Sequence, residues 1–261
     1  MSARPPEPRR SPLEGWYEHF ATARRMVADM SLASALADKV PRGTAVLLSD
    51  LSWRSRCGCK GPGAPAWLEA QGFVVPAGAN RWAQTEGVLV ARLATSEFLV
   101  EASGGATAGA AGGATGGAAG GSTGGAAGAA AGASTADGGP AAQVERARQL
   151  LATATRPPGV YPVARHDLVL RLAGPATVDL LRQTCSVDFA PLLAAAGAAA
   201  GPVVYTSMIG VGVLAQPASG AAGPQLTLWC DPSFAHYFFS ALLEVAADLG
   251  GGVALDAAAA G

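Results

Sequence analysis

The sequence feature that most constrains this fold is a strand, a Gly-Pro turn and a helix in direct succession. In residues 167–188, leucines at every second position predict a strand with one buried face, because successive side chains of a strand point to opposite sides. Gly174-Pro175 ends this run, and the fixed φ of proline suits the first turn of a helix. Apolar residues at helical spacing follow over residues 178–181. The stretch therefore predicts a strand, a tight turn and an amphipathic helix.

The same unit occurs earlier in the chain. Residues 46–59 form an extended run, Gly61-Pro62 breaks it, and a short helix is predicted over residues 64–72. After each short helix the pattern predicts two strands and an amphipathic helix, at residues 86–93, 97–101 and 143–154 in the first unit and at 203–215, 225–230 and 233–249 in the second. We therefore predict an α+β fold of two imperfect β-α-β-β-α halves.

A low-complexity segment interrupts the first half. Residues 102–140 consist almost entirely of Gly, Ala, Ser and Thr, with one charged residue, Asp137. Such small side chains cannot bury enough apolar surface to offset the entropy of ordering, so we expect a disordered Gly/Ala-rich insertion. The predicted organisation is a Pro/Arg-rich tail and aromatic arm (1–44), the first half (45–101), the linker (102–140), and the remaining helix of the first half with the second half (141–256).

Charge and hydropathy argue against several classes of function. The chain has 18 basic and 19 acidic residues and a formal net charge of -1, so no overall field favours nucleic acid or an anionic membrane. The first thirty residues lack the apolar stretch of a signal peptide, and we expect a cytoplasmic location. Residues 189–214 carry no charge, but Pro and Gly interrupt them and alanine contributes little to insertion, so no membrane span is predicted.

We find no motif for catalysis, cofactor binding or metal binding. The sequence contains neither a GxGxxG fingerprint at a strand-to-helix turn nor a phosphate loop ending in Gly-Lys-Ser or Gly-Lys-Thr. His166 and Asp167 are adjacent on a predicted strand and so point to opposite faces. Cys57 and Cys59 are two apart and face the same way, which suits neither a CxxC redox turn nor a zinc knuckle. We expect the cysteines to be reduced, small and buried.

Five residues are candidates for contact with a partner. Trp16, Tyr17 and Phe20 open an arm, predicted as a loose helix up to residue 30, that lies outside the repeated body. Arg54 and Arg56 lie on a charged face of the first strand run. Binding energy at interfaces concentrates in Trp, Tyr and Arg, so these residues are predicted to form a partner interface. The alternative for the aromatic residues is that they cover the domain's own core.

Several short motifs resemble one family. They are the repeated Gly-Pro turn and helix, LEAQGFVVP at 68–76, TSEFLV at 95–100, QTCSVD at 183–188 and LWCDPSFAHY at 228–237. Together they resemble the gamma subunit of heterotetrameric sarcosine oxidase, a family that includes the equivalent subunit of N-methylglutamate dehydrogenase. This family is related to the folate-binding aminomethyltransferase fold of the glycine-cleavage T-protein. The resemblance covers residues 12–252 apart from the linker.

The resemblance implies an accessory subunit of a complex that oxidatively demethylates a secondary amine and passes the one-carbon unit to tetrahydrofolate. It implies alpha and beta flavoprotein subunits as partners, with FAD, FMN, NAD and tetrahydrofolate on those subunits and no cofactor on this chain. The T-protein has a key aspartate in the strand after the first helix, whereas residues 86–90 here contain none. The alternative is a free-standing folate-binding or aminomethyltransferase-like protein. The residues leave open which N-methyl amine is used.

Overall fold

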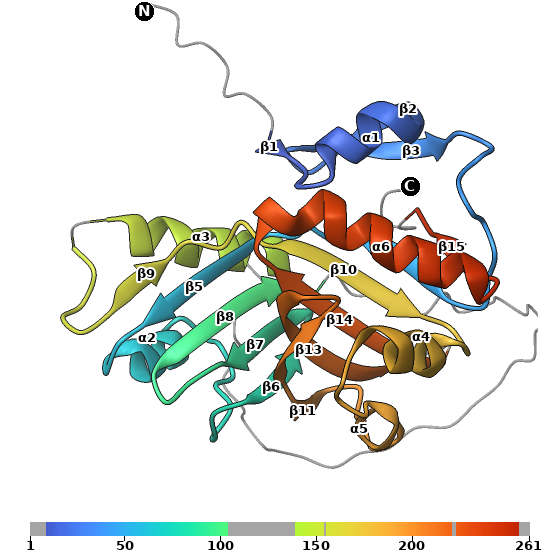
Figure 1. Cartoon of the computed structure of the whole chain (residues 1–261). Coiled ribbons are helices and arrows are strands. Elements are labelled where there is room, and N and C mark those ends of the chain that lie inside the picture. Colours follow the sequence, from blue (N-terminus) through green and yellow to red (C-terminus); the bar gives the residue numbers. More distant parts are fainter. Residues whose placement is uncertain (1–8, 104–138, 154, 221–222, 256–261) are drawn as a thin grey trace, which may run out of the picture.

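Two six-stranded sheets form the body of the chain, and the N-terminal segment adds a three-stranded sheet (Figure 1). The structure, a computed structural model, describes residues 9–103, 139–153, 155–220 and 223–255. It is a mixed α+β fold, as predicted. Nearly all of the predicted insertion at 102–140 lies outside the described residues, and so does most of the Pro/Arg-rich tail.

The first six-stranded sheet has the strand order β11-β6-β7-β8-β5-β9. Helices α2 and α3 cover one of its faces, where alternate residues of the strands pack against them. Its central strands and helices are β5 (Arg56–Lys60), α2 (Ala64–Ala70), β6 (Arg81–Thr85), β7 (Val88–Arg92), β8 (Glu97–Ala102) and α3 (Pro140–Ala152). In chain order this is β-α-β-β-β-α, one strand more than predicted for the first half.

The second six-stranded sheet has the order β12-β13-β14-β10-β4-β15. Helices α4 and α6 cover the face to which Leu168, Leu170 and Leu172 contribute, as the alternation of leucines predicted. Its central elements are β10 (Leu168–Ala173), α4 (Thr177–Thr184), α5 (Ala190–Ala194), β12 (Val204–Met208), β13 (Val211–Gly220), β14 (Gly223–Cys230), the 3-10 turn η1 (Pro232–Phe234) and α6 (Ala235–Asp248).

The run predicted as one strand over residues 203–215 is a hairpin. Its two-residue turn is Ile209-Gly210, with φ of 47° and 78°. A turn with two positive φ values normally carries Asn, Asp or Gly at its first position, and a β-branched residue is rare there. Because isoleucine is not typical of such a turn, the sequence pattern did not indicate one here. None of the helices in the described ranges combines the length and apolar character that crossing a bilayer requires.

Short strands at the edges connect the two sheets. Residues 46–59, predicted as one extended run, form β4 (Leu47–Asp50) and β5, which belong to different sheets. β4 pairs with β10 of the second sheet, and β9 (Tyr161–Val163), which precedes β10 in the chain, pairs with β5 of the first. β11 (Ala200–Pro202) likewise leaves the second unit to pair with β6, and β15 (Gly252–Val253) pairs with β4. The two units therefore exchange strands and form one body.

The two Gly-Pro turns have the same geometry. Gly61 and Gly174 have φ of 115° and 129°, a region that L side chains rarely adopt. A Cβ at Gly61 would lie 2.2 Å from the Gly159 carbonyl oxygen, and one at Gly174 would lie 2.6 Å from that of Ala45. In both cases the crowding carbonyl belongs to the segment that leads into an exchanged strand, β9 after Gly159 and β4 after Ala45. Glycine is required at both turns because each lets an exchanged strand approach.

The apolar interior has three layers. One cluster lies between the first sheet and its helices, and another between the second sheet, α4, α6 and the N-terminal arm. The third lies between the two sheets and is built from the opposite faces of the same strands, with Leu89, Leu99, Val169, Leu214 and Trp229 among its residues. Each sheet is therefore buried on both faces. The prediction of one buried face for the strand at residues 168–172 was incomplete, because Val169 between the leucines is buried against the other sheet.

The N-terminal arm folds differently from the prediction. The predicted helix up to residue 30 is a short helix, α1 (Glu14–Phe20), followed by a hairpin of β2 (Ala21–Val27) and β3 (Met30–Leu36), while β1 (Arg9–Arg10) pairs with β3. Figure 1 shows this small sheet and α1 on the outer side of α6. The arm is therefore part of the packed body, not an appendage.

Candidate functional site

The aromatic residues predicted to contact a partner are used within the chain itself. Trp16 and Tyr17 are only 2% and 5% exposed. The Trp16 ring packs edge-on against Phe239 of α6, with ring centroids 4.8 Å apart, and stacks on Phe20 at 4.6 Å. The structure therefore supports the alternative for Trp16 and Tyr17, in which they cover the domain's own core. Phe20 is half-buried beside Lys39.

A buried carboxylate, Asp50, anchors the arm. It accepts hydrogen bonds from Ser11 Oγ (2.6 Å), Tyr17 Oη (2.9 Å) and the backbone N–H of Ser52 (2.8 Å). Burial raises the pKa of Tyr17 well above its ordinary value, and the neighbouring Asp50 charge raises it further. The phenol stays protonated and donates to Asp50, so this cluster stabilises the fold and is not a catalytic acid-base pair.

Arg56, also predicted at the interface, is buried between the sheets at 6% exposure. Its guanidinium donates to the carbonyl oxygens of Asp167, Leu51 and Ser52 at 2.9–3.2 Å. Burial lowers its pKa, and the Glu101 carboxylate opposes that shift with an Nε–Oε2 distance of 3.3 Å. Arg54 reaches the other oxygen of Glu101 at 3.4 Å. These two arginines therefore neutralise a buried glutamate.

Glu101 receives a further hydrogen bond from the other sheet. Trp229 Nε1 of β14 donates to Glu101 Oε2 at 2.9 Å. In the first sheet Glu101 pairs in register with Arg56, and in the second Trp229 pairs with Val169. Arg56 and Val169 stand at the same distance before Gly61 and Gly174, so Glu101 and Trp229 occupy matching positions in the two units. The two matching residues meet at the contact between the sheets.

Sequence reasoning missed Glu101 and Trp229. Residues 97–101 were predicted as a strand, and in that strand Glu101 alternates in phase with Leu99, which faces the second sheet. This alternation was a sequence signal that the Glu101 carboxylate is buried. The partners could not be seen, because they lie on segments 45 and 128 residues away in the chain.

Four surface clefts border one residue, Arg165. Their volumes are about 240, 350, 240 and 400 Å³, and Arg165 lines each of them. Arg165 NH2 donates to Glu97 at 3.2 Å, and its NH1 lies 3.9 Å from Asp167 Oδ1, too far for a hydrogen bond. His166 is exposed and lines three of these clefts. The segment between β9 and β10 therefore borders several surface clefts at once.

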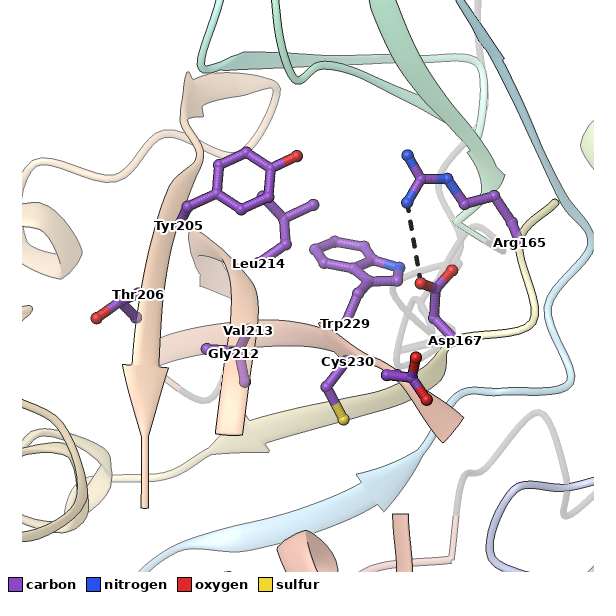
Figure 2. A pocket seen from close by; sticks show the side chains of 10 residues that line it. Arg165, Asp167, Tyr205, Thr206, Gly212, Val213, Leu214, Trp229 and Cys230 are labelled. Atoms are coloured by element: carbon purple, nitrogen blue, oxygen red, sulfur yellow. Dashed lines mark ion pairs between the residues drawn. The ribbon is translucent and has the colours of Figure 1, made fainter. Parts of the chain in front are cut away.

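One of these clefts, here called the Trp229 pocket, lies on the second sheet. Arg165 and Asp167 lie side by side at one end of it, Trp229 of β14 is next to them, and Tyr205 stands on β12, two strands away from β14 (Figure 2). Cys230 and Asp231 also line it. Burial raises the pKa of Asp167, while Arg165 and Arg56 oppose that shift. The pocket combines aromatic walls with carboxylates and one guanidinium.

Three buried thiols are poor nucleophiles. Burial raises the pKa of Cys57, Cys59 and Cys230 to about 12, so the reactive thiolate is scarce at neutral pH. This agrees with the prediction of small buried cysteines for these three, while Cys185 is half-buried. Over the residues that the structure describes, no three His, Cys, Asp or Glu side chains are grouped so as to hold a metal ion.

The buried carboxylate between the sheets does not fit a folate. A pterin ring presents paired N–H donors, which a carboxylate with free oxygens binds best. Both oxygens of Glu101 are already taken, one by Arg54 and the other by Trp229 and Arg56. A ligand there would have to displace a buried ion pair, which costs several kcal/mol.

Comparison with known proteins finds solved structures with a similar fold. No family model matches the chain, and no curated protein matches it significantly. A chain of heterotetrameric sarcosine oxidase from Corynebacterium sp. U-96, in complex with pyrrole 2-carboxylate, is similar with a TM-score of 0.55 and 19% identity, covering 93% of this chain and 96% of that one. Glycine cleavage system aminomethyltransferase T from Bartonella henselae is similar with a TM-score of 0.55 and 14% identity, covering 96% of this chain.

The two similarities differ in extent. This chain spans only 60% of the aminomethyltransferase, whereas it spans nearly all of the sarcosine oxidase chain. At identities below one fifth the similarity defines the fold, which is the one that the sequence motifs predicted. The chain has the gamma-subunit and T-protein-like fold found in heterotetrameric sarcosine oxidase and in aminomethyltransferase T.

Proposed function

We propose that this chain is an accessory, gamma-type subunit of a sarcosine oxidase-like complex that oxidatively demethylates a secondary amine. The observation that carries the proposal is the end-to-end match with one chain of a heterotetrameric sarcosine oxidase. Two further observations agree with it: the buried carboxylates of Asp50 and Glu101 are paired in structural clusters, and three of the cysteines have raised thiol pKa values. Such a chain is best suited to act by associating with partner subunits.

The alternative is a free-standing folate-binding or aminomethyltransferase-like protein. The chain spans 60% of the aminomethyltransferase. Its buried carboxylate is paired with arginine and tryptophan, which favours the subunit over the free-standing protein.

The proposal assigns the cofactors to the partners. In it, alpha and beta flavoprotein subunits carry FAD, FMN and NAD, tetrahydrofolate receives the one-carbon unit on a partner, and the assembly is cytoplasmic. We also propose that the two units are copies of one ancestral half, since the order of five strands, the Gly-Pro turns and the exchange of β4 and β9 correspond. In this view residues 102–140 are an insertion in the first copy.

Co-expression tests the proposal. The full chain, tagged, is produced with alpha and beta subunits of sarcosine oxidase type from the same source, and the purified material is analysed for subunit ratio and flavin absorbance. We expect a stoichiometric complex with a flavin spectrum, and a colourless chain when it is produced alone. Failure to co-purify, or saturable tetrahydrofolate binding by the chain alone, would overturn the accessory-subunit proposal.

A further inference from the structure

Three exposed aromatic side chains flank the end of β14, with Tyr205 on the face of the second sheet turned away from α6 and Phe234 and Tyr237 on the side of α6. Tyr205 of β12 is 57% exposed, Phe234 of η1 is 47% exposed and Tyr237 of α6 is 55% exposed. Phe234 and Tyr237 are three residues apart and are neighbours at the start of α6, while Tyr205 and Asp231 line the same Trp229 pocket. We call Tyr205, Phe234 and Tyr237 the aromatic rim. Large apolar side chains held in water indicate a surface that binds something.

Hydrogen bonds hold part of the rim, the Tyr237 side chain and the backbone that leads to Phe234. Tyr237 Oη donates to the carbonyl oxygen of Ile209 at 3.1 Å, which ties α6 to the β12–β13 turn. Asp231 accepts from the backbone N–H and hydroxyl of Ser233, which fixes the start of η1 beside Phe234. Ile209 has a positive φ, rare for a β-branched residue, and such outliers gather at functional sites. Exposed rings that are already ordered lose little entropy when a partner binds.

The charge of the Trp229 pocket favours a cation. Two carboxylates, Asp167 and Asp231, line it, and Arg165 is the single basic residue among the described residues that do so. Glu97, which is outside the pocket, is paired with Arg165 at 3.2 Å and offsets its charge. The pKa of Cys230 is raised first by burial and then by both aspartates, so the two negative charges act at the same spot. Aromatic walls attract a cation as well.

We propose that the aromatic rim and the Trp229 pocket form a docking surface for a partner protein that inserts a lysine or arginine side chain into the pocket. The apolar residues around that side chain then pack on the rim, while Asp167 and Asp231 meet its charge. This inference rests on the proposed function, because the partner is one of the flavoprotein subunits of the complex. It replaces the buried residues Trp16, Tyr17 and Arg56 as the contact surface.

The test compares matched variants of the full chain in affinity measurements with the co-expressed alpha and beta subunits. Tyr205→Ala and Phe234→Ala remove rim aromatics, and Asp231→Asn removes a charge while its side chain can still accept from Ser233. Tyr161→Ala is the control, because Tyr161 is 53% exposed on the edge strand β9 of the first sheet. Urea midpoints of all variants show that the fold is intact.

We expect Tyr205→Ala and Phe234→Ala to weaken binding roughly thirtyfold or more, as loss of an interface anchor does. Asp231→Asn should weaken it about two- to fivefold and reduce its dependence on salt, while Tyr161→Ala changes it less than about twofold. If the wild type binds and the rim variants and Asp231→Asn bind equally well, the docking surface is wrong and the proposed function stands. If the wild type fails to bind either subunit, the proposed function fails and the docking surface with it.

Discussion

Five strands of the two sheets follow the same order, β12-β13-β14-β10-β4 in one and β6-β7-β8-β5-β9 in the other, but the two units carry different chemistry at the position where they meet. In the first unit that position pairs Arg56 with Glu101, and in the second it pairs Val169 with Trp229. The tryptophan then donates to the glutamate across the contact. A similar arrangement of strands therefore does not impose a similar site. The first unit supplies the buried charge that joins the sheets, and the second supplies the ring and the exposed aromatic rim.

The largest expected effect comes from removing the buried Glu101 carboxylate of the first unit. Glu101→Ala should lower the free energy of unfolding by about 3–5 kcal/mol, because it leaves the buried Arg56 guanidinium without its carboxylate. Urea denaturation measures the loss. Glu97→Ala is the control, since its pair with Arg165 is 37% exposed at the carboxylate and such pairs contribute about 0–1 kcal/mol. Equal small losses in both variants would mean that the buried ion pair does not hold the sheets together.

Trp229→Phe removes the indole N–H that donates to Glu101. It should lower the free energy of unfolding by about 1.5–3 kcal/mol, the range for a hydrogen bond to a charged group. A double-mutant cycle with Glu101→Gln isolates the bond between the two residues. We expect the double variant to lose clearly less than the sum of the single losses. Additive losses would show that Trp229 and Glu101 act independently.

The Gly-Pro turns test whether the two units are equivalent. Gly61→Ala and Gly174→Ala should each cost about 1–3 kcal/mol, since each places a Cβ at positive φ and against a carbonyl oxygen. Gly15→Ala in α1 is the control of opposite sign, because open space surrounds that position and alanine favours a helix. A loss at only one of the two turns would contradict their equivalence.

The turns and the helices that follow them were predictable from sequence, because Gly-Pro and the apolar spacing are local signals. The exchange of β4 and β9 between the sheets was not, since it joins strands that are distant in the chain and leaves no mark in local periodicity. The burial of Trp16 and Arg56 was invisible for the same reason. A tryptophan or arginine that anchors an interface cannot be told by residue type from one that lies in the core. Only the contacts with Phe239 and Glu101 show that Trp16 and Arg56 are buried.

The smallest effect concerns the connection that distinguishes the two units. From β14 to α6 the chain needs only η1, whereas from β8 to α3 it runs from Ala102 to Pro140. Replacing residues 104–138 by a short Gly/Ser connection should change the thermal midpoint by less than about 2 °C, because the entropy of closing a loop grows only slowly with its length. A fall of more than about 5 °C would show that the segment packs on the domain.

Amide hydrogen exchange of the chain, alone and bound to the flavoprotein subunits, tests the central claim most directly. The account predicts that binding adds protection around residues 204–211 and 230–237, which carry the aromatic rim and the Trp229 pocket. It predicts little change over residues 13–36, which are already packed on α6 and Asp50. New protection confined to the N-terminal arm, or to the edge strand β9 of the first sheet, would contradict it.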